Sequence, residues 1–119
     1  MPLLAEKFHL DPTQIVPAAR GMVDVGRDSN RNTTLNLHVE HLARPGDLSP
    51  AKMTYVVWAE APDQPPQNLG QLNVNNDLKA DLKTTTALHN FQLVVTAEDN
   101  ARATAPTGPV VLSANIRQP

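Results

Sequence analysis

The sequence has no cysteine, which excludes disulfides, thiolate nucleophiles and cysteine-ligated metal sites. Aromatic residues make up only 3% of the chain, so its core must consist mainly of Val, Leu, Ile and Ala side chains. No apolar run approaches the ~20 residues that cross a bilayer as a helix, and residues 1–7 lack the pattern of a signal peptide. The composition therefore predicts no membrane insertion by this chain and leaves its compartment open.

The charges are nearly balanced and form no block of one sign. The chain has 10 basic and 12 acidic residues and a formal net charge of −2. A nucleic-acid-binding surface needs a basic patch, so no nucleic-acid partner is expected. With 119 residues, the chain is long enough for one hydrophobic core and too short for two domains.

Two β-rich runs, residues 52–60 and 91–98, dominate what the sequence does contain. Their β-branched and aromatic residues predict the central strands of an all-β domain. A third run, residues 34–42, alternates between apolar and polar residues, which predicts a strand with one buried face. We expect Phe91, Leu93 and Val95 in the core with Leu35, Leu37 and Val39, whereas Asn36, His38 and Glu40 face water.

Turn and loop signals separate these runs from shorter ones. Polar turns at 28–32 and 75–76 predict two tight hairpins, and the proline-rich segments 44–50 and 62–67 predict loops that interrupt pairing. Apolar residues nowhere recur at helical spacing over three turns. The sequence therefore predicts an immunoglobulin-like antiparallel β-sandwich of about seven strands in two sheets.

The expected domain organisation is simple. Residues 1–18, which include three prolines, form a lead-in segment or tether, loose through about residue 6 and with one possible edge strand at 7–11. Residues 19–117 form the single sandwich domain.

No group of residues in the sequence has the pattern of a catalytic or metal site. His38 and His41 are an odd step apart on an expected strand, so their side chains point to opposite faces and cannot share a metal ion. The chain's serines do not fit a nucleophile motif, and acidic residues on strands are by default solvated. We therefore expect no catalytic, cofactor-binding or metal-ligating residue, and no enzymatic activity.

Trp58 has two interpretations. A tryptophan in the middle of a central strand is typical of a residue that anchors the core between two sheets. The same indole, together with Tyr55 and the loops 44–50 and 62–68, is also the chain's best candidate for stacking against a ligand. Core packing is the favoured interpretation.

Four segments also carry a family resemblance: residues 55–59 (YVVWA), 68–72 (NLGQL), 91–98 (FQLVVTAE) and 106–112 (PTGPVVL). Over about residues 52–116 the chain resembles the extracytoplasmic C-terminal domain of anti-sigma-K factors and related exported bacterial proteins. The resemblance implies a β-sandwich located outside the cytoplasm, in the periplasm or at the cell surface. It does not extend to sigma-factor binding, because no segment here matches the helical sigma-binding domain or the membrane helix of such factors.

These observations together predict a non-enzymatic extracytoplasmic β-sandwich module that acts in sensing, protein interaction or envelope structure, with a protein partner of unknown identity. The alternative is a small module that binds carbohydrate or another ligand through Trp58 and the adjacent loops.

Overall fold

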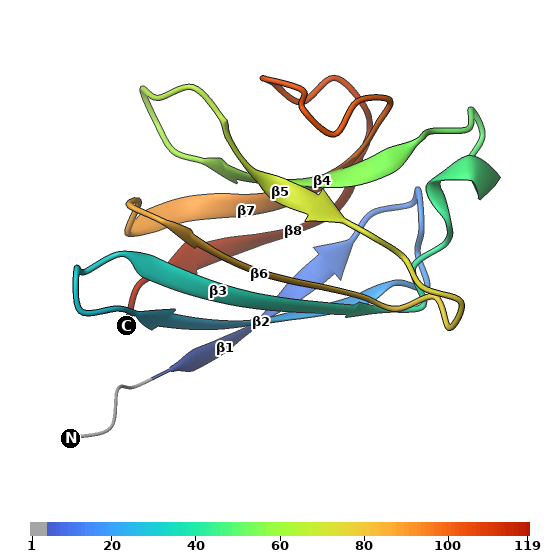
Figure 1. Cartoon of the computed structure of the whole chain (residues 1–119). Coiled ribbons are helices and arrows are strands. Elements are labelled where there is room, and N and C mark those ends of the chain that lie inside the picture. Colours follow the sequence, from blue (N-terminus) through green and yellow to red (C-terminus); the bar gives the residue numbers. More distant parts are fainter. Residues whose placement is uncertain (1–4) are drawn as a thin grey trace.

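The computed structural model describes residues 5–119 and forms an all-β fold with no α-helix in that part of the chain (Figure 1). A single 3-10 turn, η1 (Pro45–Asp47), interrupts one connection. The strands are β1 (Glu6–Pro12), β2 (Arg20–Arg27), β3 (Thr33–Glu40), β4 (Thr54–Glu60), β5 (Gln67–Leu72), β6 (Ala80–Thr86), β7 (Asn90–Glu98) and β8 (Val110–Arg117). There are thus eight strands rather than about seven. The expected loose segment at 1–6 lies mostly outside the described residues.

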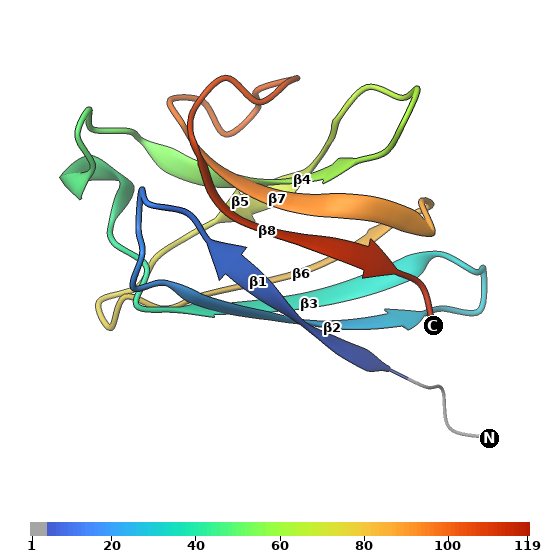
Figure 2. The ribbon, with the colours of Figure 1, turned by 180° about the vertical axis from the view of Figure 1, so that it is seen from behind.

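All eight strands belong to one antiparallel sheet in the order β5-β4-β7-β8-β1-β2-β3-β6. The expected separation into two sheets is not observed, because β1 pairs on both sides. Its residues 6–10 pair with β2, and its last two residues, Asp11 and Pro12, pair with β8. Figure 2 shows β1 crossing between the two halves. The expected edge strand at 7–11 is therefore an internal strand.

The sheet nearly closes into a barrel, since β5 and β6 lie at the two ends of the strand order but close together in space. Two hydroxyl groups of β6 link these edges: Thr84 Oγ1 donates to the Leu69 carbonyl (3.1 Å), and Thr86 Oγ1 donates to Gln67 Oε1 (2.5 Å). Two edges that face one another in this way are shielded from pairing with other chains.

The hairpin expected at 75–76 is wrong, because β5 pairs with β4 and β6 pairs with β3. The connection does turn sharply. Asn75 Oδ1 accepts hydrogen bonds from the backbone N–H groups of Asp77 (2.9 Å) and Lys79 (3.0 Å). The positive φ, however, falls on Leu78 (59°) rather than on an asparagine.

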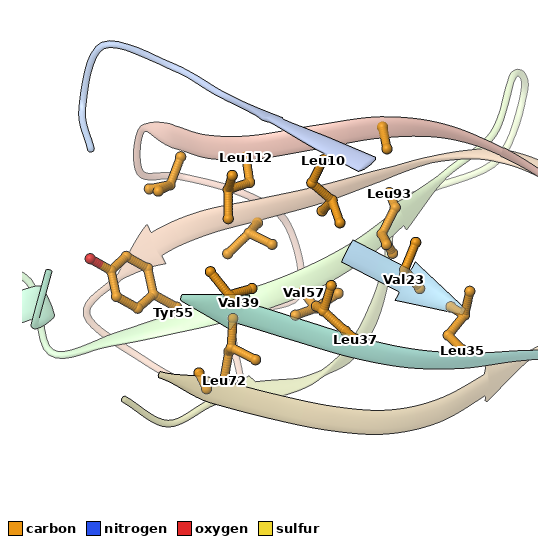
Figure 3. Packing of buried hydrophobic residues seen from close by; sticks show 14 of the residues in the cluster. Leu10, Val23, Leu35, Leu37, Val39, Tyr55, Val57, Leu72, Leu93 and Leu112 are labelled. Atoms are coloured by element: carbon orange, nitrogen blue, oxygen red, sulfur yellow. The ribbon is translucent and has the colours of Figure 1, made fainter. Parts of the chain in front are cut away.

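The core lies between the two halves of the sheet (Figure 3). The six side chains expected there from β3 and β7 are all buried, with Val39, Leu93 and Val95 fully inaccessible. The prediction of that register is confirmed. Gly21 of β2 lies opposite Leu10 of β1, and a Cβ at Gly21 would be 3.0 Å from the Leu10 Cβ. A side chain at this position would therefore crowd Leu10.

Candidate functional site

The longer connections leave the sheet at one end, here termed the loop end. They are residues 13–19, 41–53, 73–79 and 99–109, whereas the shorter connections 28–32, 61–66 and 87–89 lie at the opposite end. Most of the loop end is on the right of Figure 1. Long connections between short strands commonly carry binding functions, and the mouth of a barrel is a common place for a binding site.

Exposed hydrophobic side chains collect at the loop end. Within the described residues, the exposed large hydrophobic side chains are Ile15 (44%), Met53 (75%), Leu78 (38%) and Val110 (40%). The first three lie in loop-end connections, and Val110 directly follows the fourth. Single exposed hydrophobic residues are normal on protein surfaces, but their restriction to one end marks a surface suited to a partner.

One hollow at the loop end, here termed the basic hollow, has a volume of about 770 Å³. Its charged or titratable lining residues are His9 of β1, Arg20 of β2 and His41, which follows β3. The rest of its lining is uncharged: Leu10, Pro12, Pro17, Ala18, Ala19, Gly21 and Met22. The hollow is thus basic within a chain of net negative charge.

Polar cross-links join several connections at the loop end. Arg44 Nη2 donates to Asn76 Oδ1 (3.2 Å), which joins 41–53 to 73–79. Lys52 Nζ lies 3.7 Å from Asp99 Oδ2, which joins 41–53 to 99–109. Such contacts lower the entropy that the loops lose when a partner binds.

Tyr55 connects the core to the loop end. Its side chain is fully buried in the core, and its hydroxyl donates to the Ala43 carbonyl (2.6 Å). Burial, with a smaller effect of Asp47, raises the pKa of Tyr55 to about 12. The phenol therefore stays neutral over the physiological range and acts as a structural hydrogen-bond donor.

The connection 99–109, here termed the strap, folds back over the outer face of β4 and β7. Beneath it lies a second apolar cluster of Val56, Trp58 and Val94, with Ala103 of the strap packed against it. Asn68 Nδ2 donates to the carbonyls of Ala101 and Ala103, both at 3.0 Å. The strap thus covers an apolar patch that the sheet would otherwise expose.

Glu98 fastens the strap to β7. Its carboxylate, 1% exposed, accepts hydrogen bonds from the Thr107 hydroxyl (2.6 Å), the Thr107 N–H (3.1 Å) and the Gly108 N–H (3.2 Å). It also accepts from Thr96 Oγ1 (2.5 Å), which in turn accepts from Trp58 Nε1 (2.8 Å). Because the indole N–H can only donate, this series of hydrogen bonds requires Glu98 to be an acceptor.

The protonation of Glu98 follows from two opposing effects. Burial pushes the pKa of this carboxyl upward, but hydrogen bonds from Thr107, Thr96 and Gly108 together outweigh burial. The pKa therefore lies below its usual range, and the carboxylate is charged at neutral pH.

The residues expected to form a ligand site do not come together. Tyr55 points into the main core, whereas Trp58 lies in the separate cluster under the strap. The segment 44–50 is at the loop end and 62–66 is at the opposite end. Trp58 is fully buried, but the favoured interpretation is wrong about its place, because the indole packs outside the sheet rather than between its halves.

His38 and His41 are in different surroundings. His38 lies on the outer face of β3, with Nδ1 2.5 Å from Asp81 Oδ1 and Nε2 3.4 Å from Glu40 Oε1. The hydrogen bond to Asp81, with a smaller effect from Glu40, raises the pKa of His38. His41 lines the basic hollow. Among residues 5–119, no three His, Asp or Glu side chains are grouped so as to hold a metal ion.

The sequence patterns did not indicate the loop end, the basic hollow or the role of Glu98. Each depends on which connections share an end of the sheet, and no local pattern states this.

No family model, curated protein sequence or solved structure matches the chain. Among the described residues, no helix has the length and apolar character needed to cross a membrane. The structure itself defines the class: an all-β domain with an eight-stranded antiparallel sheet, nearly closed into a barrel.

Proposed function

We propose that this chain is a non-enzymatic recognition module that binds a protein partner through its loop end. The observation that carries the proposal is the position of the four exposed large hydrophobic side chains, which all lie at that end of the described chain. Apolar anchors beside polar and charged groups are typical of protein interfaces. The cross-links among loops provide a surface that is formed before the partner arrives.

The state of the buried polar groups supports a binding role over catalysis. Every buried side-chain nitrogen and oxygen in residues 5–119 has a hydrogen-bond partner. The most buried carboxylate, Glu98, is fully occupied by four donors, three of which are on the strap. A general base or nucleophile instead needs a free lone pair directed at a substrate.

We propose further that the two halves of the sheet are those of an immunoglobulin-like sandwich joined through β1, and that the domain works outside the cytoplasm. The support is the resemblance to the outer domain of anti-sigma-K factors. Its four segments lie on β4, β5, β7 and the start of β8, which are neighbours in the sheet. Sensing and envelope structure are both compatible with such a module. Fractionation of source cells tests this, and recovery of the protein in the cytoplasm contradicts it.

Ligand stacking on Trp58 is the alternative, and it requires the strap to move. The indole is 0% exposed and its N–H is already bonded to Thr96. A carbohydrate site on this residue would therefore have to form at the expense of the Glu98 and Asn68 hydrogen bonds. The loop end needs no such rearrangement.

Site-specific photo-crosslinking in cells of the source organism tests the proposed interface. A photoreactive residue at position 53 should give discrete protein adducts, whereas one at Gln64, in the 61–66 connection at the opposite end, should not. Substituting Val110→Asp in the first protein should abolish the adducts, because a charge is costly in an apolar interface. Equal labelling from both ends, or adducts that survive Val110→Asp, would contradict the proposal.

A further inference from the structure

The basic hollow brings together side chains that are distant in the sequence. His9 lies on β1, Arg20 begins β2 and His41 follows β3, and all three are exposed. No aspartate or glutamate is among the residues that line the hollow. Arg20 is formally charged at neutral pH, so the lining contributes a positive charge and no carboxylate of its own.

The Arg20 guanidinium is outside the ion pairs of the described residues. Its register partner on β3 is Glu40, but the Glu40 carboxylate is shared between His38 (3.4 Å) and Lys79 (3.8 Å). Within residues 5–119, the ion pairs closer than 4.0 Å do not include Arg20. The guanidinium is therefore available to an external anion, for which its planar donors are well suited.

His41 occupies a backbone conformation that places it at the hollow. Its φ is 55°, a left-handed value that is uncommon for residues other than glycine. The next residue, Leu42, is fully buried, and its N–H donates to the Leu78 carbonyl (3.0 Å). These contacts hold the turn in which His41 ends the strand and lines the hollow.

The uncharged part of the lining is largely apolar. Pro12, the last residue of β1, and Pro17, within the 13–19 connection, are stiff, and Met22 of β2 adds a flexible thioether. Met22 is the register partner of His9, so apolar and polar side chains are neighbours in the hollow. Its lining thus offers a positive charge and apolar contact close together.

We propose that the basic hollow binds a carboxylate carried next to an apolar group, as in the carboxyl-terminal residue of a partner segment. Arg20 provides the charge, His9 and His41 provide further polar ring nitrogens, and Pro12, Pro17 and Met22 contact the apolar part. The assignment of this carboxylate to a protein partner rests on the proposed function. The preference of the hollow for a carboxylate beside an apolar group follows from the lining of the hollow alone.

The histidine rings provide the direct test. Proton–carbon spectra are recorded at about pH 6 while N-acetyl-leucine is added at constant ionic strength. The signals of His9 and His41 should shift and saturate, with a dissociation constant on the order of millimolar for so small a ligand. His38 and His89, which lie outside the hollow, are internal controls and should not shift.

Two matched comparisons separate charge from apolar contact. N-acetyl-leucine amide, which lacks the carboxylate, should bind at least about tenfold more weakly, as should the free acid to the Arg20→Gln protein. Arg27→Gln, at the other end of β2, should leave the affinity unchanged. Inorganic phosphate should bind more weakly than N-acetyl-leucine, because it cannot use the apolar wall.

Each contrary result overturns a defined part of the proposal. Equal binding of acid and amide, or an unchanged affinity in Arg20→Gln, would show that the hollow does not recognise the carboxylate. Phosphate binding as tight as that of N-acetyl-leucine removes the apolar contact, and parallel shifts of all four histidines reduce the effect to non-specific screening. A positive titration with negative photo-crosslinking would retain the carboxylate site and refute the protein partner.

Discussion

Glu98→Ala should loosen the strap and uncover Trp58. The carboxylate accepts four hydrogen bonds from Thr96, Thr107 and Gly108 while 1% exposed. Each hydrogen bond to a charged group contributes about 1.5–3 kcal/mol. When the strap opens, its donor groups form hydrogen bonds with water, so the net loss of stability is smaller than the sum of four such bonds. We expect a decrease of about 3 kcal/mol in the free energy of unfolding.

The assay uses the only tryptophan of the chain as its reporter. Under native conditions the wild-type emission should be blue-shifted and resistant to acrylamide, since the indole is fully buried. In Glu98→Ala the emission should move to the red and become accessible to acrylamide before the far-ultraviolet circular dichroism changes. Glu98→Gln should show an intermediate effect. The amide retains one acceptor oxygen, but its NH2 group is a donor and would face the donors that bonded the second carboxylate oxygen.

The same bond network predicts a dependence on pH with a defined sign. The pKa of Glu98 is lowered in the folded protein, so the stability it contributes is fully present above the ordinary glutamate pKa of about 4.3. That stability is lost as the pH falls below this value and through the lowered pKa. Acid should therefore increase the acrylamide quenching of Trp58 in the wild type and change it much less in Glu98→Gln.

Glu60→Ala is the matched control. Glu60 is a half-buried glutamate at the far end of β4, and its replacement should change the unfolding free energy by about 0.5 kcal/mol or less. An unchanged denaturation midpoint and unchanged Trp58 emission in Glu98→Ala would refute the account of the strap. Equal effects of Glu60→Ala and Glu98→Ala would show that only net charge matters.

Two further predictions concern the core and the outer face of β3. Leu93→Ala should lower the unfolding free energy by about 2–5 kcal/mol in urea denaturation, because Leu93 is fully buried; a midpoint equal to that of the wild type would contradict the assigned register. Asp81→Asn should lower the raised pKa of His38 toward about 6.5 in a ring-proton titration. The pair stabilises the fold below the ordinary histidine pKa and loses this effect as the pH rises through the raised value, so an unmoved His38 titration would contradict the pairing.

The strands and the buried faces of the two best-patterned strands could be predicted from local sequence. Alternation in β3 and the run of β-formers in β7 predicted Leu37 and Leu93 in the core, and both are buried. Such patterns are reliable because a shift of one residue would turn every apolar side chain to the other face. The number of strands and the pairing of β1 were less accessible, since residues 6–12 carry only a brief alternation.

The turn sequences did not indicate which strands pair with each other. The polar segment before β6 suggested a hairpin with β5, yet each strand pairs with a different neighbour. Sheet curvature brings these two edges together from opposite ends of the strand order, so a short connection does not require a backbone ladder. A turn signal predicts a reversal of the chain and leaves the partner to the rest of the sheet.

The position of Trp58 shows how a local pattern misleads in a nearly closed sheet. Tyr55 and Trp58 are an odd step apart, so period-two geometry directs them to opposite faces of β4, and only one of them can enter the core. The core holds Tyr55, which leaves an indole on the face that a simple sandwich turns toward water. The strap solves this problem, and its attachment through Glu98 and Asn68 restricts one side of the loop end. The connections 13–19, 41–53 and 73–79 are outside this network, and they carry most of the surface on which we propose that a partner binds.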